Sequence, residues 1–293
     1  MLYHSLKEIC ELAQEQNSSF WQVVCEDDCR ERQATKEESL QVMQKMYEAM
    51  QRADRAYQSD QKSPSKMAGG DGARLQKYVA EGNNLSGHFI GKVMERAVKM
   101  AETNACMGRI VAAPTAGSCG VLPAVLLTYE ESLQGNREQM IQALYVAAGI
   151  GQIIAERASI AGASGGCQAE IGAASAMAAG ALTFLRGGSA DQICSAAAIA
   201  LKGLLGLTCD PVAGLVEVPC VKRNVIGAVN AVTATDMVMA GITSVIPADE
   251  VIDAMGEIGR EMPKKFRETS EGGLAVTPSA LKIKQELVND PEL

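Results

Sequence analysis

Residues 171–185 read IGAASAMAAGALTFL, and this stretch decides the fold class of the chain. Small or apolar side chains occupy nearly every face of a helix formed here, so such a helix has to be buried on most of its sides. Alanine and glycine also allow neighbouring helices to pack at short interaxial distances. The sequence therefore predicts an all-α protein, with buried Ala/Gly-rich helices joined by glycine-rich loops.

Helix boundaries outside this stretch are well marked. Four positions combine an N-capping residue with Glu or Gln three residues later, and a fifth has Pro at the first helical position. These predicted helix starts are Ser5, Thr35, Asn136, Ser189 and Thr277. Strand patterns are scarce, and LVEV at residues 215–218 is the best candidate for a short strand.

The first 60 residues differ in composition from the rest of the chain. They are rich in charges, and after Thr35 the apolar residues recur every three or four positions, as on one face of an amphipathic helix. Residues 59–72, SDQKSPSKMAGGDG, then exclude a continuous helix. We expect an N-terminal helical arm at 1–60 and a helical main domain at 61–293, together forming one structural unit.

Composition limits the classes of partner. The chain has 293 residues, of which 47% are hydrophobic and 21% charged, so it can bury a core. Its formal net charge of −8 argues against a nucleic-acid partner, which would require a basic surface. A small molecule or another protein is the expected partner.

Neither a membrane span nor a secretory signal is predicted. The longest uncharged run, residues 110–129, is interrupted by Pro114 and Gly117, which favours a loop leading into a helix. The opening MLYHSLKEIC carries charges where a signal peptide would be apolar. Nine cysteines without such a signal indicate free or metal-bound thiols, and we expect a cytoplasmic protein.

Three of the nine cysteines stand at predicted helix breaks. Cys167 follows two glycines in ASGGCQAE, Cys209 precedes Asp-Pro, and Cys220 follows Pro in VEVPCVKRN. Backbone N–H groups are free at such breaks, which favours thiolates and cluster sulfides. The spacings of 42 and 11 residues match neither a ferredoxin nor a zinc motif, so a metal site and simple packing both remain open. The other six cysteines are expected to be small buried hydrophobes.

Three long segments resemble the signature segments of the iron–sulfur-dependent L-serine dehydratases. These are AAPTAGSCGVLPA at 112–124, GASGGCQAEIG at 162–172 and LTCDPVAGLVEVPCVKRN at 207–224. The resemblance is to the alpha (catalytic) chain of the branch whose regulatory part is a separate polypeptide. It extends from the GGD segment near Gly69 to the GGLAVTP segment near Gly272.

The resemblance implies the cofactor and the reaction. It implies a 4Fe-4S cluster held by Cys167, Cys209 and Cys220, with no pyridoxal phosphate. With three ligands, one iron keeps an open position and can act as a Lewis acid on the hydroxyl of L-serine. Water is eliminated, and the product becomes pyruvate and ammonia, a step of amino-acid catabolism that feeds gluconeogenesis. A separate beta (regulatory) chain is implied as a partner in a heterodimer.

Further site residues are expected in polar, glycine-bearing turns. A turn of small residues ahead of a helix leaves N–H groups that suit a carboxylate, and a nearby lysine could bind the same group. We expect substrate contacts from Lys66, Thr115, Ala116, Gly117, Ser118 and Ser164. No general base is identified: His88 lies outside every signature segment, and the family's partner chain brings a Ser- and His-bearing segment near the site.

Three other functions remain open at the level of sequence. Lys66 in PSKMAGG could be a pyridoxal-phosphate lysine, although that cofactor needs an α/β fold. The chain could also be a helical scaffold whose cysteines are merely packed. A related iron–sulfur lyase acting on cysteine is the nearest enzymatic alternative.

Overall fold

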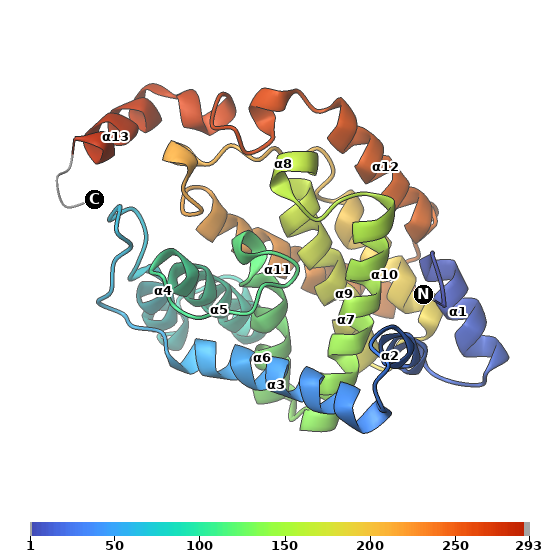
Figure 1. The fold of residues 1–293 in the computed structure, drawn as a ribbon. Helices are drawn as coiled ribbons and strands as arrows, with labels where there is room; N and C mark the ends of the chain where they lie inside the picture. Colours follow the sequence, from blue (N-terminus) through green and yellow to red (C-terminus); the bar gives the residue numbers. More distant parts are fainter. Residues whose placement is uncertain (1, 290–293) are drawn as a thin grey trace.

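A computed structural model describes residues 2–289, and in this part of the chain helices dominate (Figure 1). Short 3₁₀ or π turns join some of the α-helices. The α-helices are α1 (Leu6–Glu15), α2 (Phe20–Glu31), α3 (Lys36–Arg55), α4 (Asp71–Ala80), α5 (Gly87–Ala105), α6 (Val121–Leu133), α7 (Arg137–Arg157), α8 (Gly162–Gly165), α9 (Ala173–Leu185), α10 (Ala190–Lys202), α11 (Cys220–Met239), α12 (Ala248–Glu261) and α13 (Pro278–Val288). The prediction of an all-α fold is confirmed.

The predicted buried helix is α9, and it lies at the centre of the molecule. It packs against α6, α7, α10 and α11, and its residues 173–183 are all buried. Gly180 shows why small residues are needed, because a side chain there would overlap Ile150 of α7. The apolar stretch begins at Ile171, two residues before α9, in the π-helical turn η2 (Gln168–Gly172), which the sequence does not predict.

The predicted helix starts agree with the structure. Thr35, Asn136 and Ser189 each form a reciprocal capping box, and Thr277 caps α13 ahead of Pro278. At Ser5 only half of the box forms, since the Glu8 side chain accepts from the backbone N–H of His4 instead.

The predicted strand at 215–218 is wrong. These residues form turns and bends, because Glu217 N–H bonds back to Leu215 C=O and Val212 N–H bonds to Val218 C=O. The segment is drawn into a compact loop instead of lying extended. In the described residues, the one isolated strand-like bridge joins Cys209 to Arg267, and it becomes part of the candidate site.

The first three helices pack directly onto the rest of the molecule. Tyr3, Ile9, Phe20 and Tyr47 belong to the same hydrophobic cluster as α7 and α9. In Figure 1, α1 lies beside α10 on one side of the molecule, and α13 lies at the opposite side. Among the described helices, none is both long and apolar enough to cross a membrane.

Candidate functional site

Helix starts and one loop position the three predicted cluster cysteines. Cys167 directly precedes η2, after Gly166 with its φ of 75°, and Cys220 is the first residue of α11. Cys209 lies in the loop after α10, where its N–H donates to Phe266 C=O and its C=O accepts from Glu268 N–H. All three side chains are buried.

These three cysteines lie close enough to affect one another. Burial raises the pKa of the Cys167 thiol to about 11. Burial raises the pKa of Cys220 to about 12, and the charge of Cys167 adds to it. The pKa of Cys209 is also raised, first by burial and then by the charge of Cys167. The folded chain therefore gathers three thiols from distant segments into one buried region.

Three buried cysteines have the donor chemistry that clusters of several irons take. Within the described residues, no three His, Cys, Asp or Glu side chains gather tightly enough to hold a single metal ion. A four-iron cluster is larger than one ion, so its cysteine ligands stand further apart. Buried thiols become thiolates only beside positive charge, which bound iron supplies. Gly162 allows the chain to pass close to these groups, since a Cβ there would lie 2.7 Å from Glu170 Oε2 and 3.1 Å from Cys209 Sγ.

A buried ion pair fixes the loop that carries Cys209. Arg223 of α11 donates to Asp210 Oδ1 at 2.9 Å and to Thr208 C=O at 2.8 Å. The other oxygen of Asp210 accepts from Leu274 N–H at 2.8 Å, in the 3₁₀ turn η5 (Gly273–Val276). One carboxylate thus ties together α11, the Cys209 loop and the C-terminal part of the chain.

The predicted turn at 115–118 lies beside the cysteines and faces a carboxylate. It forms a 3₁₀ turn, η1 (Ala116–Ser118), and Thr115 Oγ1 donates to Glu170 Oε1 at 2.8 Å. A Cβ on Gly117 would lie 3.1 Å from the same oxygen. Glu170 also contacts Cys209 Sγ through its second oxygen at 3.9 Å, and burial raises the pKa of its carboxyl group.

A second buried carboxylate holds the segment that carries Lys66. Glu217 lies between Cys209 and Cys220 in the sequence. It accepts hydrogen bonds from Ser63 Oγ and Ser65 Oγ, both at 2.6 Å. Lys66 follows with a positive φ of 63° and an exposed side chain. The structure therefore ties the Lys66 segment to the cysteine-bearing loop, and its role as a substrate contact stays a prediction.

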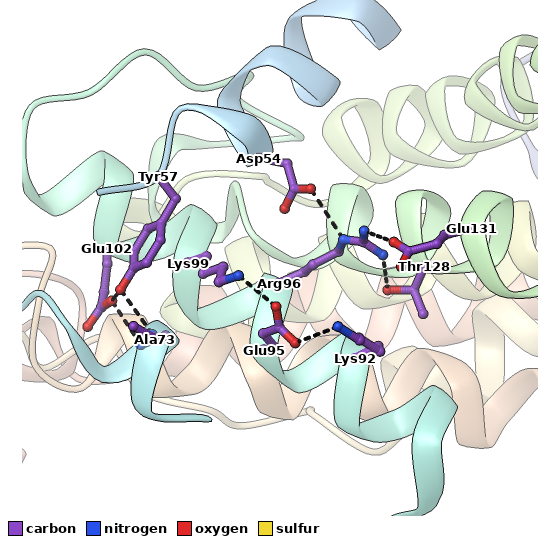
Figure 2. A network of polar contacts seen from close by, with 11 residues as sticks. Asp54, Tyr57, Ala73, Lys92, Glu95, Arg96, Lys99, Glu102, Thr128 and Glu131 are labelled. Carbon is purple, nitrogen blue, oxygen red and sulfur yellow. Dashed lines mark hydrogen bonds and ion pairs between the residues drawn. The ribbon is translucent and has the colours of Figure 1, made fainter. Parts of the chain in front are cut away.

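Glu102 of α5 anchors the other end of the same segment (Figure 2). Its Oε1 accepts from the N–H groups of Gly69 and Asp71, and its Oε2 accepts from Gly72 N–H and from Tyr57 Oη. The side chain is almost fully buried. The neighbouring Arg96 binds Asp54, Thr128 and Glu131, so α5 is fixed to α3 and α6 as well.

Replacing Glu102 by glutamine is expected to lower the free energy of unfolding by about 3 kcal/mol, since two charge-assisted hydrogen bonds are lost. Each of the two Glu102 carboxylate oxygens accepts two hydrogen bonds. Whichever way the glutamine amide is oriented, its NH₂ group therefore faces two donors with which it cannot bond. Urea unfolding measures the change. Glu81→Gln, at an exposed position, is the control, and equal stability of the two variants would contradict the anchoring role.

Ser164 lies on α8, three residues before Cys167. It is exposed on α8 and lines a small cavity of about 140 Å³ facing α12, with Gln168 and Met255. A larger cavity of about 540 Å³ adjoins the turn at Ala116 and the buried Glu217, and α13 lines its other wall. This larger cavity gives small molecules space beside the candidate site.

Glu170 and Arg267 are charged groups of the site that the sequence did not single out. Glu170 lies within the segment GGCQAEIG, so its sequence position offered a signal. Arg267 offered none, because only the bridge to Cys209 brings it to the site. The side chains of two residues paired in a bridge point to the same face, so the Arg267 side chain lies on the side of Cys209. Its Nε atom is buried and has no hydrogen-bond partner among the described residues. An anion bound here would supply the missing acceptor.

Comparison with known proteins gives the class and then the relatives. The profile of the serine dehydratase alpha chain family matches residues 15–275, and the chain belongs to this family. A Bacillus subtilis protein named probable L-serine dehydratase, alpha chain, is 46% identical over 98% of this chain and 95% of its own length. The L-serine dehydratase alpha chain of Peptoniphilus asaccharolyticus is 38% identical over 99% of both chains. The Escherichia coli L-serine dehydratase TdcG is 46% identical over 69% of this chain and 46% of its own.

Proposed function

We propose that this chain is the catalytic alpha chain of an iron–sulfur-dependent L-serine ammonia-lyase, which converts L-serine into pyruvate and ammonia. The observation that carries the proposal is the meeting of Cys167, Cys209 and Cys220 in one buried region beside a polar turn. The names of the full-length relatives support serine as the substrate.

The three cysteines would hold a 4Fe-4S cluster through their thiolates. When bound, such a cluster supplies an iron with an open position, a Lewis acid for the departing hydroxyl group. Arg223 lies near Cys167 and partly offsets the effect of burial on its pKa. Its positive charge therefore favours the thiolate that a metal requires.

The polar groups beside the cysteines complement an amino acid. A serine zwitterion carries an ammonium and a carboxylate group on one carbon atom. In our proposal the Glu170 carboxylate, oriented by Thr115, binds the ammonium group. The first N–H groups of the turn at 116–118 and the Arg267 guanidinium are the donors for the carboxylate.

The elimination removes the α-proton and the β-hydroxyl group of serine as water. The aminoacrylate that remains tautomerises to an imine, and water hydrolyses it to pyruvate and ammonia. The α-proton requires a base. We propose that a separate beta chain supplies this base or its helper, consistent with relatives that are named alpha chains.

Pyruvate formation from L-serine tests the proposal. The chain is purified without air, its iron and sulfide are measured, and turnover is followed alone and with a separate beta chain. We expect bound iron and sulfide, low activity alone and a large gain on mixing. If the chain holds no iron and stays inactive in the mixture, the chain is a helical scaffold and not an enzyme. If it prefers cysteine to serine as substrate, it is an iron–sulfur lyase that acts on cysteine.

Replacing Thr115 by valine is expected to lower kcat/KM for serine about thirtyfold while iron content stays normal. Valine keeps the shape but removes the hydroxyl that donates to Glu170, and one hydrogen bond to a charged group is worth about 2 kcal/mol. Thr115→Ser keeps the hydroxyl and is the matched control. Unchanged kcat/KM in the valine variant would place the ammonium group elsewhere.

A further inference from the structure

Two cysteines far apart in the sequence face each other outside the candidate site. Cys10 of α1 and Cys194 of α10 bring their Sγ atoms to 3.3 Å from each other. Both are free thiols and both are partly exposed. A disulfide bond has an S–S length of about 2.05 Å, so bond formation needs an approach of only roughly 1.3 Å.

The surroundings of this pair admit a small reagent. Both cysteines line an open cavity of about 1030 Å³ between α1, α10 and the start of α12. The charged side chains of its wall carry net negative charge, with Glu11, Asp191, Asp249 and Glu250 against the single Lys7. Negative charge repels anionic oxidants such as glutathione disulfide, whereas an uncharged peroxide enters without that penalty.

We propose that Cys10 and Cys194 form a site of reversible oxidative modification, at which hydrogen peroxide converts the two thiols into a disulfide bond. The Cys10 sulfur attacks one peroxide oxygen, the O–O bond breaks, and a sulfenic acid and water are formed. The Cys194 sulfur then displaces the hydroxyl group as a second water. Two thiols lose two electrons and two protons, and one peroxide is reduced to two molecules of water.

The environment of Cys194 indicates which step it performs. The hydrogen bond to Cys10 and burial raise the pKa of Cys194. Because burial disfavours the thiolate of Cys194, we assign Cys194 to the second, resolving step. Cys194 then lies in contact and acts as the resolving thiol.

The bond would fasten the N-terminal helix to the core. With the two thiols reduced, Asp249 of α12 accepts hydrogen bonds from the N–H groups of Leu6 and Lys7. The side chains of Leu6 and Ile9 are buried and also hold α1 in place. A link between residues 10 and 194 would close a very long loop in the unfolded chain. Because this restricts the unfolded state, the oxidised chain should melt at a temperature about 5–10 °C higher.

Peptide mapping of the full-length chain tests the proposal. The chain is treated with hydrogen peroxide, its remaining thiols are alkylated, and it is cleaved after Lys, Arg and Glu. This cleavage separates Cys10, in residues 9–11, from Cys25 and Cys29. We expect residues 9–11 linked to 187–202 in most of the protein, release of the link by dithiothreitol, and the rise in Tm.

Single variants provide the controls. Cys10→Ser and Cys194→Ser should lose both the link and the rise in Tm, whereas Cys29→Ser should keep both. The wild-type map decides the question even if a variant fails to fold. Cys10 and Cys194 that stay reduced, or that carry separate sulfinic or sulfonic acids, would overturn the proposal.

Discussion

Replacing Cys209 by serine is expected to abolish pyruvate formation from L-serine and to remove most of the iron of the chain. A serine hydroxyl is a poor ligand for iron, and the buried region of the described chain offers three cysteines as ligands, the fewest that would leave only one iron open. The same result is expected for Cys167→Ser and Cys220→Ser. Iron and sulfide analysis and the visible spectrum, measured on the preparation used for kinetics, separate loss of the cluster from loss of activity alone.

Cys29→Ser is the matched control for these variants. Cys29 is a free, partly buried cysteine on α2, outside the site, so both iron and activity should remain. Full activity in any of the three site variants would show that its cysteine is not a ligand. Full iron content with lost activity would instead assign that thiol to the substrate side of the site.

Replacing Asp210 by alanine is expected to lower the free energy of unfolding by about 3–5 kcal/mol. Its side chain is only 5% exposed and Arg223 only 15%, so the variant leaves a buried guanidinium without its partner. The bond to Leu274 N–H is lost as well. Urea unfolding reports the stability, and iron content should fall because the Cys209 loop is released.

An exposed ion pair provides the comparison. Arg157 binds Asp253 through two hydrogen bonds, but the Asp253 side chain is 51% exposed. Pairs of this kind contribute about 0–1 kcal/mol, so Asp253→Ala should change stability little. If Asp210→Ala were no less stable than Asp253→Ala, the buried pair would not hold the loop.

Local signals explain which parts of the fold the sequence predicted. The caps at Thr35 and Asn136 need only residues three positions away, and the burial of α9 follows from its own composition. The LVEV segment failed as a strand because its conformation depends on partners far along the chain. Glu217 in that segment is bound by Ser63 and Ser65, more than 150 residues earlier.

In the candidate site too, the sequence predicted the features with local signals and missed those that depend on contacts between distant segments. The cysteines stood out because glycine and proline mark helix breaks next to them, and the turn at 115–118 carried small residues. Arg267 and the pairing of Asp210 with Arg223 could not be predicted, since they depend on contacts between separate segments. Which groups share a buried region is a property of the packing and not of any one motif.

The bridge between Cys209 and Arg267 also determines when the site can form during protein synthesis. Chains emerge from the ribosome N-terminal end first. The backbone partners of Cys209, at Phe266 and Glu268, follow Cys220, the last of the nine cysteines, by 46 and 48 residues. A nascent chain that already displays all nine cysteines therefore still lacks these partners of Cys209, and we expect the pocket to close only after residue 268 has been made.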